Sequence, residues 1–435
     1  MGSRVRVLLV NYRYFVSGGP ERYLFGVTEL LEQAGHEVVP FSVRYSLNEP
    51  TEWADYFVSP IGSEDELRFA DHERSFKTSV KAVTRAFYSA EVYRATKRII
   101  EAARPDVAYV LHYLRKMGPA VLSALKDAGV PTVVRFSDFG MICPNAHFLR
   151  DGAVCELCAD GALMPSVKHR CVQGSLGASA VNALATRAHR MTRVFDSIDT
   201  FVCPTEIMAT KMQAAGQFRS RFIVLPTFTT APATAVSDAA PERPADGVRS
   251  VCYIGRLNPE KGVGVLIDAA NALAEGMGDR IRIDLVGTGP DAYAQSLRDR
   301  LTPEAARIVR FLGKLDKAGV EAVLRASDLS IVPSVWYENM PNSLLESWAV
   351  GTPVVASDIG SLHDMVAGSG AGELFETGSA ESLALTVERL LAEPGRLVMM
   401  SERARALAAT TYAPKTHLEG LVDVLEGARS RGAAR

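Results

Sequence analysis

Short apolar runs alternate with longer stretches of helical periodicity along most of the chain. The first run, residues 5–10, is typical of a buried parallel strand, and a Gly-containing turn and a helical pattern over 21–34 follow it. A second strand is expected at 36–41, so the chain begins with the strand–helix–strand unit of a parallel sheet. Further strands of this first series are expected at 107–111, 131–136 and 200–203.

A second series of the same kind begins after a stretch rich in Ala, Pro, Thr and Ser. Its strands are expected at 251–255, 281–286, 309–312, 329–332 and 353–356. The sequence therefore predicts an α/β protein of two doubly wound, Rossmann-like domains with a ligand cleft between them. The expected boundaries are a first domain over 1–225, a linker over 226–248, a second domain over 249–412, and a C-terminal helix and tail over 413–435.

Composition narrows the class of protein. Of the 435 residues, 47% are hydrophobic and 23% charged, which excludes global disorder and a fibrous repeat. A net charge of −2 argues against a nucleic-acid partner. The apolar runs are too short to span a bilayer or to act as a signal peptide, so we expect a cytoplasmic protein.

Two carboxylates flank the start of a predicted helix near residue 341. Pro341 is expected to be the first helical residue, so that 342–345 form the first turn. The free amides of such a turn attract an anion such as a phosphate. Glu338 lies just before this turn and Glu346 more than a turn inside it. They would suit a sugar hydroxyl and a ribose hydroxyl on either side of a diphosphate.

A Gly-bounded loop over 255–262 supplies positive charge. Its Arg256 and Lys261 are expected to neutralise a diphosphate. The chain contains no Asp-x-Asp motif, so a leaving nucleoside diphosphate would have to be stabilised by the protein's own cations. Gly18 and Gly19, after the first strand, would let backbone amides approach the same phosphate.

These motifs resemble those of retaining nucleotide-sugar glycosyltransferases of the GT-B fold, in the large glycosyltransferase family 4 (group 1 type). The resemblance covers nearly the whole chain. It rests on the Gly-Gly turn, the Gly-Arg…Lys-Gly loop, Gly287-Thr-Gly289, the Glu-x7-Glu motif and the segment 351–358 that follows it.

The resemblance implies roles for single residues. It implies that Glu338 contacts the donor sugar, that Glu346 holds the ribose, and that Arg256 and Lys261 stabilise the leaving diphosphate. The donor would be a UDP- or GDP-sugar, and catalysis would need no cofactor. Retention would proceed on one face of the sugar, with the donor phosphate accepting the acceptor's proton. The donor-binding residues expected are Gly18, Gly19, Gly287, Gly289, Asn339, Met340, Pro341, Asn342, Ser343 and Glu346.

One position departs from the family pattern. Many members carry His-Asp after the strand that here ends at residue 136, whereas this chain has Ser137 and Asp138. Asp138 remains a catalytic candidate because it follows a parallel strand. His112, at the end of another strand of the first domain, is the substitute candidate for contact with the sugar or the acceptor. Which of the two contacts the reacting centre stays open.

A cysteine-rich insertion lies at about 143–171. Its four cysteines are Cys143, Cys155, Cys158 and Cys171. A Cys-x2-Cys pair flanked by two more cysteines resembles a structural zinc site, and cysteine-rich insertions occur at this place among relatives of the family. Free thiols are the second interpretation, and two disulfides in a reducing compartment the third.

Basic residues are concentrated on helical stretches of the first domain. They are Lys77, Lys81, Arg85, Arg94, Lys97 and Arg98, interleaved with Phe76, Val80, Phe87, Tyr88 and Tyr93, and a second group of Arg187, Arg190 and Arg193. A solvated helix face explains these residues most simply. The sharper interpretation is peripheral contact with the inner face of a membrane, or with a lipid-phosphate acceptor.

The sequence thus predicts a glycosyltransferase whose second domain binds a nucleotide sugar and whose first domain binds a hydroxyl acceptor. The acceptor could be a glycan, a lipid-linked sugar or a secondary metabolite. A sugar-nucleotide epimerase of the same fold, or a non-catalytic sugar-nucleotide-binding scaffold, are the alternatives. A dehydrogenase is disfavoured because the first turn lacks Gly-x-Gly-x-x-Gly.

Overall fold

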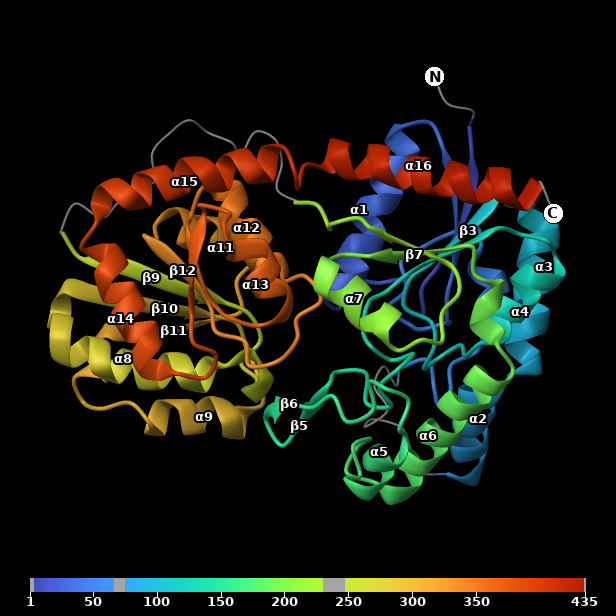
Figure 1. The fold of residues 1–435 in the computed structure, drawn as a ribbon, viewed down its shortest axis with the longest axis horizontal. Helices are drawn as coiled ribbons and strands as arrows, with labels where there is room; N and C mark the ends of the chain where they lie inside the picture. Colours follow the sequence, from blue (N-terminus) through green and yellow to red (C-terminus); the bar gives the residue numbers. More distant parts are fainter. Residues whose placement is uncertain (1–3, 66–74, 230–246, 434–435) are drawn as a thin grey trace. The chain divides into compact units, whose positions relative to one another are not determined.

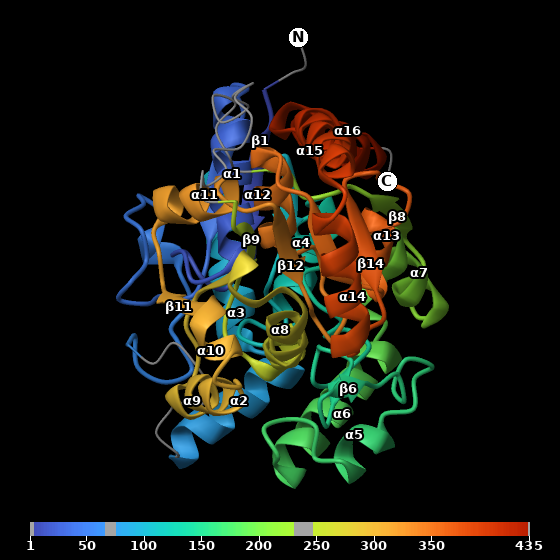
Figure 2. The same ribbon diagram turned by 90° about the vertical axis from the view of Figure 1, so that its left-hand side faces the viewer.

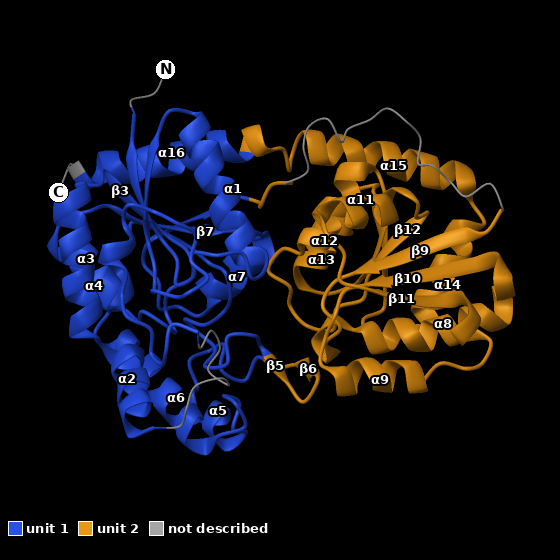
Figure 3. Ribbon diagram, turned by 180° about the vertical axis from the view of Figure 1, so that it is seen from behind, with its two compact units in different colours: residues 1–148, 156–225, 417–435 blue, residues 149–155, 226–416 orange. Residues whose placement is uncertain are grey.

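The chain forms two compact units, each built on a parallel sheet (Figure 1). The computed structural model describes residues 4–65, 75–229 and 247–433. Unit 1 comprises residues 1–148, 156–225 and 417–435, and unit 2 comprises 149–155 and 226–416 (Figure 3). The predicted α/β class with two Rossmann-like sheets is confirmed. Most of the predicted linker lies outside the described residues.

The six strands of unit 1 run parallel in the order β2-β1-β3-β4-β7-β8. Five of them coincide with predicted strands to within a residue or two. The edge strand β8 was not predicted, although residues 222–225 form a short apolar run. The strands are β1 (Arg6–Val10), β2 (Glu37–Phe41), β3 (Val107–Val110), β4 (Thr132–Arg135), β7 (Thr200–Cys203) and β8 (Arg221–Val224).

Eight helices accompany this sheet in the described part of unit 1. The C-terminal helix begins in unit 2 and runs over unit 1, where Tyr23 Oη and His417 Nε2 lie 3.0 Å apart and Arg431 donates to Thr200 Oγ1 at 2.7 Å. The helices are α1 (Gly19–Gln33), α2 (Phe76–Phe87), α3 (Ala90–Ala103), α4 (Ala120–Asp127), α5 (Met164–Lys168), α6 (Leu176–Met191), α7 (Glu206–Ala214) and α16 (Pro414–Ala433).

Unit 2 repeats the architecture with the strand order β11-β10-β9-β12-β13-β14. Its strands are β9 (Arg249–Ile254), β10 (Ile281–Val286), β11 (Val309–Gly313), β12 (Leu329–Val332), β13 (Val354–Ser357) and β14 (Gly372–Phe375). Its helices are α8 (Val263–Met277), α9 (Asp291–Asp299), α10 (Ala305–Ile308), α11 (Lys317–Arg325), α12 (Asn342–Val350), α13 (Gly360–Val366), α14 (Ala380–Leu391) and α15 (Pro394–Ala409). Helices α8 and α14 pack side by side on this sheet (Figure 2).

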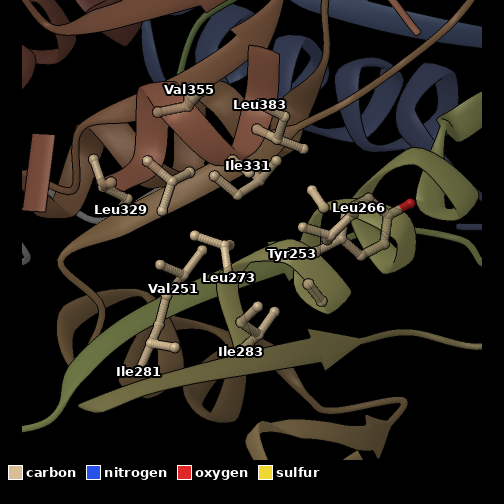
Figure 4. Packing of buried hydrophobic residues seen from close by; sticks show 14 of the residues in the cluster. Val251, Tyr253, Leu266, Leu273, Ile281, Ile283, Leu329, Ile331, Val355 and Leu383 are labelled. Atoms are coloured by element: carbon tan, nitrogen blue, oxygen red, sulfur yellow. The ribbon is translucent and has the colours of Figure 1, made fainter. Parts of the chain in front are cut away.

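A hydrophobic core fixes the central strands of unit 2. Val251 of β9 and Ile331 of β12 pack with Leu266 of α8 and Leu383 of α14, all essentially without solvent contact (Figure 4). A second cluster anchors α12 through the buried Trp348. Burial of this much apolar surface holds β9, β12 and α12 in place, and with them the loops at their ends.

None of the described helices is long and apolar enough to cross a membrane.

Candidate active site

The two predicted motif loops of unit 2 come together. One follows β9 and covers residues 255–262, and the other follows β12 and covers 333–341. Strands β9 and β12 are parallel neighbours, so both loops leave the same edge of the sheet. The Val335 amide donates to the Glu260 carbonyl at 3.1 Å, which joins the loops directly.

Glu338 is the centre of this loop pair. Its Oε1 accepts hydrogen bonds from Lys261 Nζ at 2.7 Å, Ser334 Oγ at 2.6 Å and Trp336 Nε1 at 2.9 Å. The residue is 8% exposed. Burial acts to raise the pKa of Glu338, but the Lys261 charge and the three donors outweigh it, so the pKa is lowered. Glu338 is therefore an ionised carboxylate held in one position.

The two cations of the loop differ in accessibility. The Lys261 ammonium is partly buried, pairs with Glu338 and lies 5.5 Å from the centre of the Trp336 ring. The Arg256 side chain is 65% exposed, and its guanidinium lies 3.9 Å from Glu260 Oε1. An ion pair this exposed is weak, so Arg256 is the cation more open to an incoming anion.

Gly262 allows the two loops to approach. Its φ is +68°, and a Cβ at this position would lie 1.7 Å from the Pro333 carbonyl oxygen. Only glycine fits there. The sequence analysis used Gly262 only as the boundary of a motif, and this packing role was missed.

Gly287 and Gly289 also have a packing role. A Cβ on either would lie within 2 Å of a backbone carbonyl oxygen of the loop after β9, at Gly255 and Leu257 respectively. The Leu257 amide donates to the Thr288 carbonyl at 2.9 Å. Close approach of the two loops therefore accounts for these glycines without a ligand, and their donor contact stays a prediction.

The predicted anion-binding turn is the start of α12. The helix begins at Asn342, and Pro341 is its N-cap with ψ 122°, so the prediction of Pro341 as the first helical residue was wrong by one position. In the described structure Pro341 provides no side-chain cap, so the first-turn amides, beginning at Asn342 and Ser343, lack a side-chain acceptor at the cap. Glu346 is partly exposed on the second turn.

Two more of the predicted donor residues precede this turn. Met340 packs against the cluster that anchors α12, and its Sδ lies 3.1 Å from the Thr227 amide nitrogen. Asn339 is half-buried.

The Gly-Gly turn in unit 1 lies at the start of helix α1, next to a buried carboxylate that the sequence analysis did not expect. Gly18 is the N-cap of α1 and Gly19 its first residue. The first turn also holds Glu21, a buried carboxylate that accepts from Ser17 Oγ at 2.9 Å and lies 4.0 Å from Arg13 Nη1. The sequence analysis missed Glu21, whose negative charge already lies at the helix start where a phosphate was expected.

The two alternative candidates of unit 1 form a pair. His112 Nε2 lies 3.1 Å from Asp138 Oδ2, at the ends of the neighbouring strands β3 and β4. The Gly140 amide donates to Asp138 Oδ1 at 2.7 Å, and the Tyr12 ring meets His112 edge-on. Burial acts to raise the pKa of Asp138, but the hydrogen bond and charge of His112 outweigh it and lower the pKa.

We predict a pH signature for this pair. The pKa of Asp138 is lower in the folded state than its unfolded value of about 3.9. The ionised Asp138 therefore stabilises the folded protein above about pH 3.9, and this stabilisation is lost as the pH falls from there toward the folded-state pKa. Asp138→Asn should lower the free energy of unfolding by about 1–2 kcal/mol at pH 6 and by much less near pH 3. Urea titrations across this range measure it. Asp423→Asn, an exposed residue of α16, is the control. An equal loss at every pH would contradict the prediction.

The structure does not support the predicted zinc site at Cys143, Cys155, Cys158 and Cys171. All six cysteines of the chain lie in the described residues, and none of them forms a disulfide bond. Cys143 Sγ donates to Asn145 Oδ1 at 2.9 Å, so this thiol is hydrogen-bonded within its own turn. Over residues 4–65, 75–229 and 247–433, no three His, Cys, Asp or Glu side chains could hold a metal. A cysteine spacing alone does not make four side chains converge.

Family models match most of the chain. A model described as a glycosyl transferase 4-like domain matches residues 18–227, and one described as glycosyl transferases group 1 matches residues 248–393.

Two curated relatives differ in how much of them is matched. Phosphatidyl-myo-inositol mannosyltransferase of Mycobacterium leprae is 33% identical over 144 residues, which are 33% of this chain and 37% of that protein. The chain is thus aligned with well under half of this relative. The enzyme of the same name from Mycolicibacterium smegmatis is 26% identical over 410 residues, 91% of this chain and 88% of that protein.

Solved structures share the fold. Sucrose-phosphate synthase from Thermosynechococcus elongatus superimposes with a TM-score of 0.70 at 18% identity, over 99% of this chain and 100% of that one. Anabaena HepE in complex with UDP and glucose gives a TM-score of 0.59 at 17% identity, over 98% and 100%. At these identities the likeness concerns the fold alone.

Proposed function

The chain belongs to the family 4-type group 1 glycosyltransferases and has the GT-B fold, and from this premise we propose that it transfers a hexosyl group from a nucleotide sugar to a hydroxyl acceptor with retention. Unit 2 binds the donor, a UDP- or GDP-sugar, and unit 1 binds the acceptor. The UDP in Anabaena HepE supports a uridine donor, and the mannosyltransferase relatives support a hexosyl group.

The observation that carries the proposal is the Lys261–Glu338 pair between the two motif loops. As the bond from the sugar to the diphosphate breaks, negative charge grows on the diphosphate. Lys261, the exposed Arg256 and the first-turn amides of α12 supply fixed positive charge for it, with no metal ion required at the catalytic centre. Glu338, held beside Lys261, is then placed for the hydroxyls of the donor sugar.

The proton balance needs no dedicated base. The bond from the anomeric carbon to the diphosphate breaks while a bond to the acceptor oxygen forms on the same face. The acceptor's proton passes to an oxygen of the departing diphosphate. The protein contributes alignment and electrostatics.

In unit 1 the His112–Asp138 pair supports an acceptor-side or sugar contact through His112. Asp138 then acts as a positioning residue that holds the imidazole by its Nε2. The names of the relatives support a lipid-linked or inositol-containing acceptor. A glycan and a secondary metabolite are the alternative acceptors.

The test is thermal-shift binding of UDP-, GDP-, ADP- and dTDP-sugars, each with and without a chelator. One donor should raise the melting temperature regardless of the chelator. Glu346→Ala should weaken the binding of that donor at least about tenfold, because a hydrogen bond to a charged group contributes about 1.5–3 kcal/mol. Glu402→Ala, an exposed residue of α15, is the matched control and should change nothing.

The outcomes separate the alternatives. NMR of the product of a turnover assay reports whether the anomeric configuration is retained. Conversion of the donor without any acceptor would favour an epimerase. Donor binding without turnover would favour a scaffold. If none of the four donors shifts the melting temperature, the proposed donor site is wrong.

A further inference from the structure

Helix α2 exposes an apolar stripe to solvent and buries one of its three cations, Arg85. Phe76, Val80 and Val83 follow one another at helical spacing, so they share one side of the helix, and all three are exposed, Phe76 to 86%. Arg85 points the other way and is 0% exposed. Its Nη1 donates to the Lys116 carbonyl at 2.7 Å, and its Nη2 lies 3.1 Å from Glu91 Oε2. A surface helix normally does the reverse.

Helix α6 has a second exposed apolar stripe. Leu176, Leu184 and Met191 lie on one side of the helix together with Arg187, and Met191 is 73% exposed. On the inward side, His189 Nε2 lies 2.9 Å from the Ala86 carbonyl oxygen of α2. Helices α2 and α5 both pack against α6, and the three lie together at one end of unit 1 (Figures 1 and 3).

These three helices carry only positive charge. Over α2, α5 and α6 there is no Asp or Glu, although the whole chain has slightly more acidic than basic residues. Their basic residues are Lys77, Lys81, Arg85, Lys168, Arg187 and Arg190. Lys77, Lys168 and Arg187 are exposed. Lys81 lies 3.8 Å from Glu91, so the basic side for which the sequence analysis weighed membrane contact against a solvated helix face is partly turned inward.

We propose that the exposed stripes of α2 and α6 dock this protein peripherally on an anionic lipid bilayer. Apolar side chains that enter the interface, flanked by cations that meet lipid phosphates, are what such a surface binds. A second copy of the chain would bring positive charge against positive charge. A nucleic acid would use the cations and leave the apolar stripes in water.

Flotation with phosphatidylcholine vesicles, with and without phosphatidylglycerol, tests the proposal. The protein should bind only the anionic vesicles. The paired variants Phe76→Ser with Val80→Ser, and Leu184→Ser with Met191→Ser, should each lower the partition coefficient at least about tenfold. Lys77→Glu with Arg187→Glu should lower it similarly and make the residual binding insensitive to phosphatidylglycerol.

The matched control is Leu385→Ser with Met399→Ser, two exposed apolar residues of unit 2, which should bind like the wild type. Absence of wild-type binding to anionic vesicles, or equal binding by all variants, would overturn the proposal. So would a dimer in light scattering that the stripe variants abolish. The proposal does not rest on the donor site, and the stripe variants should keep the thermal shift with nucleotide sugar.

Discussion

Lys261→Ala should lower the rate of sugar transfer by about 10²–10³-fold, because one fixed positive charge at the leaving diphosphate is lost. It should also lower the free energy of unfolding by about 3 kcal/mol, since it leaves the buried Glu338 without its cation. Steady-state kinetics with the best donor and urea unfolding measure the two effects. A variant with unchanged kcat would contradict the leaving-group role.

A double variant separates the two losses. Lys261→Met combined with Glu338→Gln removes both charges, so no uncompensated carboxylate remains, and stability should largely recover while activity does not. Single Lys261→Ala has a further signature. Without the lysine, burial is no longer offset and should raise the pKa of Glu338. The folded variant then takes up its proton above the ordinary Glu pKa of about 4.3, so its deficit against the wild type should begin to shrink as pH falls through that raised pKa. Below about 4.3 the deficit should shrink further, because the wild type loses the stabilisation that its lowered Glu338 pKa provides.

The sequence predicted the loops of this site but not the contact between them. Arg256, Lys261 and Glu338 were singled out by their motifs and by the strands that precede them. The hydrogen bond from Lys261 to Glu338 joins residues 77 positions apart. It exists because β12 returns to lie beside β9, and neighbouring positions in a parallel sheet are not encoded in either strand alone.

Other features depended on partners that local patterns do not reveal. The spacing of α2 identifies a two-sided helix, but its orientation is set by Glu91 and the Lys116 carbonyl, which hold Arg85 inside. His112 and Asp138 were weighed as alternatives, and strand pairing made them one unit. The cysteine spacing suggested a zinc site, whereas Cys143 is bound to Asn145 within its own turn.

The sequence also did not reveal the packing roles of the motif glycines. Gly287 and Gly289 were assigned to the donor by motif, yet the carbonyl oxygens of Gly255 and Leu257 already exclude a side chain there. A motif glycine can therefore be required by the protein's own backbone before any ligand binds.

Gly262→Ala is expected to be strongly destabilising, because the added methyl group has no room. The residue has φ +68°, and the new Cβ would lie 1.7 Å from the Pro333 carbonyl oxygen, an atom fixed at the end of β12. Either the loop 255–262 moves away from the loop 333–341, which separates Lys261 from Glu338, or β12 shifts within its sheet. We expect a loss of more than about 3 kcal/mol in the free energy of unfolding, together with loss of the donor-induced thermal shift.

Gly378→Ala is the control that isolates the close approach. The φ of Gly378 is +82°, similar to that of Gly262, but no atom lies within 4 Å of the added Cβ. Gly378→Ala should therefore lower the free energy of unfolding only by the cost of the left-handed backbone, about 1–2 kcal/mol. Urea unfolding of both variants gives the difference, and donor binding should survive in Gly378→Ala. If the two variants lose equal stability and both bind donor, the loop after β9 moves freely. Contact between the loops would then not be what positions the two charges.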